Sequence, residues 1–564
     1  MALLLFEQTW MDVWEGAEPR EPVGAIFTRP EIIELILDLA GYRPEFERLA
    51  TARLLEPSCG DGAFLTAAIR RLLTSERLHQ KTINWFDADL ESALTACDLN
   101  SGFISIARQQ TTDLLIEEGC PAQRAQVLAE KWIIHADFLL AHWPTRFDFV
   151  VGNPPYVRIE DLPPNVLSRY RELYHTSTDR ADLYVAFVEN GLRLLSPRGC
   201  LAFICANRFA KNLYGRTLRQ LIANQFHVRY YLNLEHTQPF ISDVSAYPCI
   251  AVIDRQRGQP TSSATLHDIA PATLQAISPA SNPTKSKSPL ASFSSWYADG
   301  APWIATEHAG FDRLASLAQS CPTLEESATD TVVGIGVATG ADSVYIVPRL
   351  QPDIERRCQL PLLMAADIRP AALTWSGHYL INPFSSADDG SLRDLQAHPG
   401  LAAYFLRHRA QIQKRHVARK RPDSWYRTID RVTLSLTQRP KLVIPDIQSG
   451  GVVGYDAGDY YPHHNVYWIT SAGWNLRALQ ALLRSQIVLE QIRAYSVQMR
   501  GGSLRYQAQV LRKVHIPAAN KLSVDLIRRL AAVAISENQS EIDAVAVEAF
   551  ALGAGSPAPE AQAG

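Results

Sequence analysis

The chain has 564 residues, of which 47% are hydrophobic, and its formal net charge at pH 7 is -3. This hydrophobic content excludes a mainly disordered chain, and the length exceeds that of one ordinary core, so we expect two main domains. The near-neutral charge excludes a uniformly basic nucleic-acid binder, and any such function must depend on local clusters of charge.

The N-terminal residues carry no basic leader, and no apolar run approaches the roughly 20 residues of a membrane span. We therefore expect no membrane association and a bacterial-type cytoplasmic location. The eight cysteines contain no Cys-x2-Cys pair. Their scatter among apolar strands indicates reduced core thiols, and we expect neither a metal site nor a disulfide framework.

Alternating strand and helix patterns from about residue 25 to 255 predict a doubly wound α/β domain. Leu54 to Leu65 has the form of a strand, a glycine turn and a helix start. Gly60 and Gly62 permit a ligand to approach the backbone closely, as at the end of the first strand in open α/β sheets.

Two later strands each end in an acid. Asp98 stands at the spacing expected of a carboxylate that binds a ribose hydroxyl pair. Asp137 is followed by Phe138, so an acceptor for an amino group lies beside a ring that can cover a base. Strand-end acids are often only turn residues, but an ordered series of polar strand ends favours a nucleoside-binding site.

Asp148 to Tyr156 is an apolar run followed by Asn-Pro-Pro-Tyr. Asn153 offers a side-chain carbonyl, and Pro154 offers a main-chain carbonyl whose direction proline constrains. Two such acceptors suit one planar amino group, and the Tyr156 ring can stack on a base taken out of a duplex. A helix at 182–195 and a buried strand at 200–206 are expected to follow.

The second half of the chain contains two basic stretches. Residues 407–427 hold eight Lys or Arg against one acid, with aromatic residues interleaved. Such a stretch could bind successive phosphates of a nucleic acid, and a solvated helix face is the alternative interpretation. The other stretch combines arginines with paired glycines at 501–502. The candidate phosphate contacts are Lys414, Arg415, Arg419, Lys420, Arg500 and Arg505. Gly-Val-Ala-Thr-Gly at 336–340 lacks the lysine and Ser/Thr of a P-loop, which argues against nucleotide hydrolysis.

We expect five segments along the chain. These are a catalytic domain at 1–257, a flexible Ser/Pro-rich connector at 258–300, a target-recognition domain at 301–520, a C-terminal helical segment at 521–552 and a disordered tail at 553–564.

The ordered motifs resemble those of the gamma-class, Taq-type adenine-N6 DNA methyltransferases of type II restriction-modification systems, over roughly residues 20 to 520. The segments 332–342 and 455–468 are similar to the specificity domain of that family. The resemblance implies a doubly wound class I methyltransferase domain followed by a mixed α+β DNA-specificity domain. It also implies S-adenosylmethionine as cofactor, double-stranded DNA as substrate, a separate restriction endonuclease as functional partner, and a monomer.

The family motifs fall on particular residues of this chain. The positions that the resemblance assigns to the cofactor are Thr28, Glu56, Gly60, Asp98, Asp137 and Phe138. Those that it assigns to catalysis are Asn153, Pro154, Pro155 and Tyr156, with Phe240 as the second aromatic across the flipped base and Tyr247 as its competitor.

The implied reaction needs neither a covalent intermediate nor a general base, because two acceptors can draw the amine toward a nucleophilic shape. Four alternatives remain open: methylation of RNA or of protein glutamine, methylation of cytosine N4, a fused nuclease-methylase, and a DNA-binding module without catalysis. The basic second domain argues against the first, and the motif order favours adenine over cytosine. Few residues precede the first motif, which argues against a fused nuclease. The intact catalytic loop argues against the last.

Overall fold

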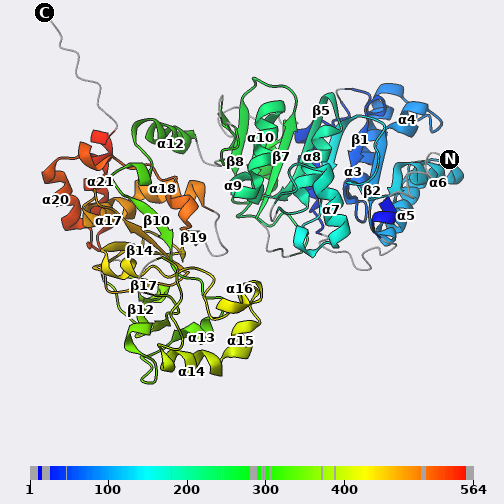
Figure 1. Ribbon diagram of the computed structural model, residues 1–564. Coiled ribbons are helices and arrows are strands. Elements are labelled where there is room, and N and C mark those ends of the chain that lie inside the picture. Colours follow the sequence, from blue (N-terminus) through cyan, green and yellow to red (C-terminus); the bar gives the residue numbers. More distant parts are fainter. Residues whose placement is uncertain are drawn as a thin grey trace, which may run out of the picture. The chain divides into compact units, whose positions relative to one another are not determined.

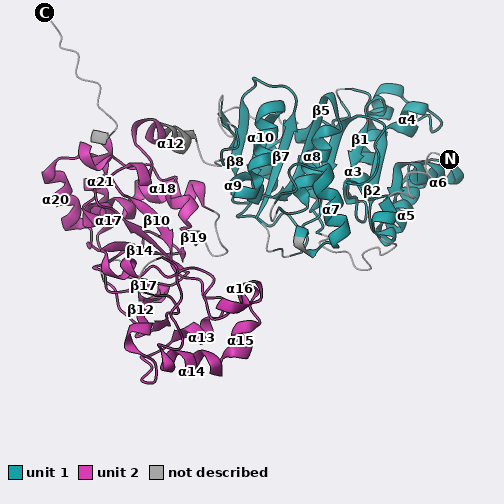
Figure 2. Cartoon of the chain, viewed as in Figure 1, with its two compact units in different colours: residues 1–308 teal, residues 309–564 magenta. Residues whose placement is uncertain are grey.

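The computed structural model describes residues 10–14, 26–45, 47–178, 181–242, 244, 247–279, 289–293, 296–297, 299–303, 308–369, 372–385, 389–496 and 503–553. The chain divides into two compact units, residues 1–308 and 309–564 (Figure 2). The tail predicted at 553–564 lies, apart from its first residue, outside the described residues.

The first unit is built on a nine-stranded sheet of order β3-β2-β1-β4-β5-β7-β6-β8-β9 (Figure 1). Five neighbouring strands, β3, β2, β1, β4 and β5, are parallel to one another. Strand β7 runs antiparallel to both of its neighbours, β5 and β6. The strands are β1 Leu54–Glu56, β2 Leu94–Asp98, β3 Ile133–His135, β4 Phe147–Gly152, β5 Leu195–Ala206, β6 His227–Asn233, β7 Pro248–Asp254, β8 Thr261–Thr265 and β9 Ala291–Phe293. This sheet confirms the predicted doubly wound domain.

Helices cover both faces of this sheet, as the alternation of side chains along β5 shows. Cys200, Ala202 and Ile204 belong to a core with α2 and α3, whereas Leu201 lies next to Gly191 of α8. The helices of the unit are α2 Pro30–Ala40, α3 Ala63–Gln80, α4 Ala88–Ser92, α5 Ser101–Glu117, α6 Ala122–Trp132, α7 Pro164–Leu173, α8 Tyr184–Arg193, α9 Arg208–Lys211, α10 Arg216–Gln225 and α11 Pro271–Ile277.

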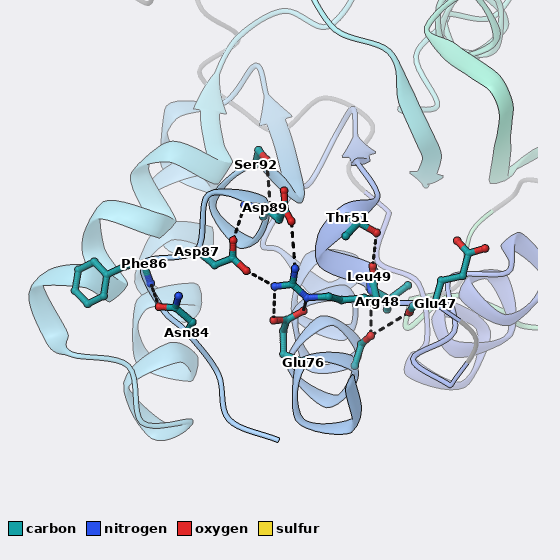
Figure 3. A network of polar contacts seen from close by, with 11 residues as sticks. Glu47, Arg48, Leu49, Thr51, Glu76, Asn84, Phe86, Asp87, Asp89 and Ser92 are labelled. Atoms are coloured by element: carbon teal, nitrogen blue, oxygen red, sulfur yellow. Dashed lines mark hydrogen bonds and ion pairs between the residues drawn. The ribbon is translucent and has the colours of Figure 1, made fainter. Parts of the chain in front are cut away.

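In the first unit, Arg48 contacts three acidic side chains on two helices (Figure 3). Arg48 binds Glu76 of α3 through two hydrogen bonds of 2.9 Å, and it also contacts Asp87 and Asp89 at the start of α4. The Glu76 side chain is fully buried. Arg48 therefore neutralises a buried carboxylate and holds α4 against α3, a role that no local motif indicates.

The prediction of a flexible connector at 258–300 is wrong for much of its described part. β8 pairs with β6 in parallel, and β9 pairs with β8, so this segment adds two strands to the sheet of the first unit. In the chain, α11 follows β8 and precedes β9. Thr261 and Ser263 are buried, and pairing with β6 and β9 satisfies their backbone groups within the sheet. Residues 280–288, at the centre of the predicted connector, lie outside the described residues.

The second unit is a mixed α and β structure, as predicted. Its sheets have the orders β10-β18-β14-β16, β11-β13-β12-β17 and β15-β19. The strands are β10 Val332–Ile335, β11 Ile346–Val347, β12 Gln359–Leu363, β13 Tyr379–Ile381, β14 Lys441–Pro445, β15 Ile447–Gln448, β16 Gly454–Asp456, β17 Tyr461–Pro462, β18 Val466–Thr470 and β19 Leu504–Arg505. The helices are α12 His308–Ser320, α13 Asp342–Tyr345, α14 Pro399–Arg407, α15 Arg409–Gln413, α16 His416–Lys420, α17 Leu476–Arg484, α18 Gln486–Tyr495, α19 Ala508–Leu511, α20 Val524–Val533 and α21 Gln539–Gly553.

The helical segment predicted at 521–552 is part of this second unit. Leu526 and Leu530 of α20 and Phe550 of α21 are buried in one core with α17, α18 and the sheet that contains β14. Within the described residues, no helix combines the length and the apolar character that crossing a membrane requires.

Candidate active site

A cavity of about 340 Å³ opens at the carboxyl ends of β1, β2 and β4 in the first unit. Its volume is that of a pocket for one cofactor-sized molecule. Nine of the sequence-predicted residues line it: Thr28, Glu56, Gly60, Asp98, Asp137, Phe138, Asn153, Pro154 and Pro155. Parallel strands bring their carboxyl ends to one edge, which explains why motifs about a hundred residues apart meet here.

The turn after β1 contributes part of the cavity lining. Gly60 and Gly62 have φ values of 52° and 92°, in the region that glycine tolerates best. A Cβ on Gly62 would lie 3.3 Å from the Cβ of Ala107 on α5. The turn therefore depends on glycine for both its backbone conformation and its packing.

The carboxylate of Asp98 fixes this turn. Its Oδ2 accepts a hydrogen bond from the Gly60 N–H at 2.9 Å, and its Oδ1 accepts one from Asn100 at 2.9 Å. Burial raises the pKa of Asp98, and the backbone donors partly offset that effect. The residue predicted to bind a ribose thus also links the end of β2 to the glycine turn.

Both carboxylate oxygens of Asp137 already accept hydrogen bonds from the protein itself. Its Oδ2 accepts hydrogen bonds from Trp14 Nε1 at 2.9 Å and from the Tyr170 hydroxyl at 2.6 Å. Its Oδ1 accepts from the N–H groups of Leu139 and Leu140 at 2.8 and 3.3 Å. These bonds favour the carboxylate, although burial, the larger effect, raises its pKa.

Trp14 and Tyr170 both line the cavity and were missed by the sequence analysis. Trp14 ends a helical turn at residues 10–13, whose Trp10 ring meets His135 edge-on at a centroid distance of 5.1 Å. The Val13 carbonyl accepts a hydrogen bond from Asn165 at 2.5 Å. A single tryptophan 123 residues before its partner gives no recognisable pattern in the sequence.

Glu56 is a buried acid without full compensation. It is 1% exposed, and its Oε2 has no hydrogen-bond partner among the described residues. Burial raises the pKa of Glu56 well above its usual value, and the nearby negative charges of Asp98 and Asp61 add to the shift. The cavity therefore presents an electronegative group that a cationic ligand would satisfy.

Asn153 is held so that only its amide nitrogen is satisfied. Its Nδ2 donates to the Ile26 carbonyl at 2.8 Å and to Thr28 Oγ1 at 3.3 Å. Its Oδ1 is buried, and no group in the described part of the chain donates to it. The segment 27–29 is fixed in turn, because Arg29 N–H donates to the Pro239 carbonyl at 3.0 Å. The Asn153 Oδ1 atom is therefore an acceptor of fixed direction at the cavity wall, where a bound molecule could donate a hydrogen bond to it.

The two aromatic candidates lie beside the cavity and are not part of its lining. The rings of Tyr156 and Phe240 meet edge to face, with centroids 6.0 Å apart and an interplanar angle of 83°. Phe240 is 3% exposed and pairs its backbone with Thr28. The two rings that were predicted to enclose a flipped base are therefore in direct contact with each other.

The predicted DNA contacts divide into two groups. Lys414, Arg419 and Lys420 are exposed on and around α16. Arg415 differs, because its guanidinium donates to carbonyls that include those of Thr339, Trp425 and Arg427. The prediction that Arg415 follows phosphates is thus replaced by a structural role.

The second basic stretch shows the same division. Arg505 is bound to the Asp446 carboxylate, so its charge is neutralised within the unit. Arg500 lies outside the described residues.

The sequence and the fold of the chain are similar to those of known proteins. Residues 70–240 match the Eco57I restriction-modification methylase family. The type II methyltransferase M.PaeR7I of Pseudomonas aeruginosa is 43% identical over 93% of this chain and 90% of its own length. M.XhoI of Xanthomonas vasicola is 39% identical over 94% of this chain and 97% of its own length. The structure of the type IIL restriction-modification enzyme MmeI in complex with DNA is similar in fold, with a TM-score of 0.61, 13% identity, and coverage of 98% of this chain and 76% of that one.

Proposed function

Because the chain belongs to the type II DNA methyltransferases of restriction-modification systems, we propose that it methylates the N6 amino group of an adenine turned out of double-stranded DNA. The observation that carries this proposal is the unsatisfied, buried Oδ1 of Asn153. Its direction is set by the two hydrogen bonds of Nδ2, and the Pro154 carbonyl follows in the chain as a second acceptor.

The cavity fits S-adenosylmethionine, the methyl donor of this family. The close backbone approach at Gly60 suits the methionine part, and the buried Glu56 carboxyl, which a nearby cation would favour in its ionised form, suits the cationic groups. Asp98 would hold the ribose, and Phe138 would lie against the adenine ring. When bound, the cofactor supplies an electrophilic methyl group.

The residues of the chain then act by position and charge. Asn153 Oδ1 and the Pro154 carbonyl accept the two N–H bonds of the target amine, which lowers the delocalisation of its lone pair into the ring. Tyr156 and Phe240 separate to enclose the base and stabilise positive charge on it through their ring faces. Asn153 cannot serve as a general base, and the mechanism does not require one.

DNA recognition is proposed for the second unit. The exposed cations Lys414, Arg419 and Lys420 would contact phosphates, which position the duplex without reading its sequence. We further propose that the enzyme acts as a monomer and protects the host sites of a separate endonuclease.

The test is modification-sensitive sequencing of plasmid DNA from cells that express the wild-type chain or Asn153→Ala. We expect N6-methyladenine at one short motif with the wild type and none with the variant. Asn84→Ala is the matched control, because Asn84 is exposed and lies outside the cavity lining. Calorimetry should show that Asn153→Ala still binds S-adenosylmethionine.

Two results would contradict the proposal. N4-methylcytosine in place of N6-methyladenine would establish the other target base. Unmodified DNA from a folded, cofactor-binding wild-type protein would exclude double-stranded DNA as the substrate.

A further inference from the structure

Two segments of the second unit that are far apart in sequence meet at close range. One is the loop after β10, residues 336–341, and the other is the turn between β17 and β18, residues 463–465. Val337 N–H donates to the Pro462 carbonyl, and Gly336 N–H donates to the Val466 carbonyl, both at 3.0 Å. A Cβ on Gly336 would lie 2.2 Å from the carbonyl oxygen of His463, so only glycine allows this contact.

At this junction three side chains converge on one point. His463 Nε2 lies 3.3 Å from Asp342 Oδ2, and His464 Nδ1 lies 3.9 Å from the same oxygen. One ligand atom from each of the three residues lies within 4.8 Å of the others. The two imidazole rings come from consecutive residues, yet their centroids are only 4.0 Å apart.

Each histidine has one ring nitrogen without a partner among the described residues. In His463, which is 3% exposed, Nε2 is hydrogen-bonded to Asp342 and Nδ1 is the atom without a partner. In His464, whose side chain is 37% exposed, the atom without a partner is the buried Nδ1, which faces Asp342. A buried ring nitrogen without a partner is costly unless a ligand satisfies it.

The carboxylate is oriented by a second layer of contacts. Thr339 Oγ1 donates to Asp342 Oδ1 at 2.5 Å, which leaves Oδ2 directed at the histidines. The Thr339 carbonyl in turn accepts from Arg415 at 2.6 Å. Hydrogen bonds of this kind typically fix metal-binding carboxylates.

We propose that Asp342, His463 and His464 form a zinc site in the second unit. Two imidazoles and one carboxylate suit Zn²⁺, whereas Mg²⁺ and Ca²⁺ prefer oxygen ligands alone. Three protein ligands leave the fourth tetrahedral position to water or to an incoming group. The ion would cross-link segments 121 residues apart. The proposal does not depend on the methylation reaction, and it replaces the expectation, based on cysteine spacing, that the chain holds no metal.

The test uses the full-length chain, without an affinity tag, after treatment with a chelator. Titration with zinc alone, followed by calorimetry, should reveal one site per chain, and cobalt in its place should give the visible absorption of a tetrahedral complex. His464→Ala and Asp342→Asn should each weaken zinc binding by more than the roughly 10- to 100-fold that loss of a second-layer partner causes.

His416→Ala is the matched control, because His416 is an exposed histidine of the same unit, and it should bind zinc as the wild type does. Thermal unfolding provides a second measurement. Without metal, His464→Ala should unfold at the same temperature as the wild type, and zinc should raise the transition of the wild type alone. Equal zinc binding by the wild type and His464→Ala, or an octahedral cobalt spectrum, would overturn the proposal.

Discussion

At the scale of single residues, the polar groups of the cavity differ in how far the protein itself satisfies them. Asp137 receives four donors, whereas Glu56 Oε2 and Asn153 Oδ1 receive none from the residues that the structure describes. An unsatisfied buried group costs about 1–3 kcal/mol, which ligand binding can recover. The cavity therefore favours a positively charged group of a ligand beside Glu56 Oε2 and a hydrogen-bond donor beside Asn153 Oδ1.

The raised pKa of Glu56 predicts that cofactor binding depends on pH. A cationic ligand favours the carboxylate, so binding lowers this pKa and releases a proton in the range between the bound and free values. Affinity should therefore rise with pH through that range and level off above the pKa of the free protein. Calorimetry in two buffers of different ionisation enthalpy measures the release. Glu56→Gln should reduce the number of protons released, and an unchanged number would assign the proton to another group.

Trp14→Phe tests the indole contact with Asp137. The change removes one donor from a buried carboxylate, and hydrogen bonds to charged groups contribute about 1.5–3 kcal/mol. We expect the Kd for S-adenosylmethionine to rise roughly 10- to 100-fold. Trp85→Phe is the control, because Trp85 lies outside the cavity lining. Tighter binding by Trp14→Phe would instead show that the indole competes with the cofactor for Asp137.

These residues also show what local sequence can predict. The acids Asp98 and Asp137 are recognisable because each follows an apolar strand, and strand ends of a parallel sheet converge. Trp14, Tyr170 and the internal bonds of Arg415 depend on contacts between distant segments, which composition and spacing do not encode.

At the scale of elements, the sequence predicted the first five parallel strands better than the sheet's far edge. The parallel strands are continuous apolar runs, which are distinctive. β8 reads Thr-Ser-Ser-Ala-Thr, and its composition is that of a linker. Its strand conformation comes from pairing with β6, a partner that its own residues do not specify.

The Arg48 junction yields a prediction about stability. Arg48→Met leaves the fully buried Glu76 carboxylate without its cation, and such a loss costs about 3–5 kcal/mol. The urea-induced transition of the first unit should shift to lower concentration by that amount of free energy. Arg70→Met, an exposed change on the same helix, should leave the transition in place. Equal midpoints for the two variants would contradict a stabilising role of the Arg48–Glu76 ion pair.

At the scale of the whole molecule, the chain consists of two units with separate cores. The sequence predicted two main domains with a connector at 258–300 between them, whereas the compact units divide after residue 308. The cofactor-cavity residues lie in the first unit, and the exposed cations proposed to contact DNA lie in the second.

This division predicts separable activities. A fragment of residues 1–308 should bind S-adenosylmethionine as the intact chain does, but should not methylate the recognition motif, because it lacks the proposed DNA contacts. Calorimetry and modification-sensitive sequencing measure the two properties. The control is an intact chain with a protease site inserted at 304–307, which should remain active until it is cut. Methylation of the same motif by the fragment alone would place sequence recognition in the first unit.

The eight cysteines are all free and buried. The folded protein should therefore present no thiol to a maleimide reagent, whereas the denatured chain should present all eight. One exposed cysteine introduced into each unit would then carry a fluorescent dye without background labelling. Energy transfer between such a donor and acceptor would then measure whether the distance between the two units changes when DNA is added.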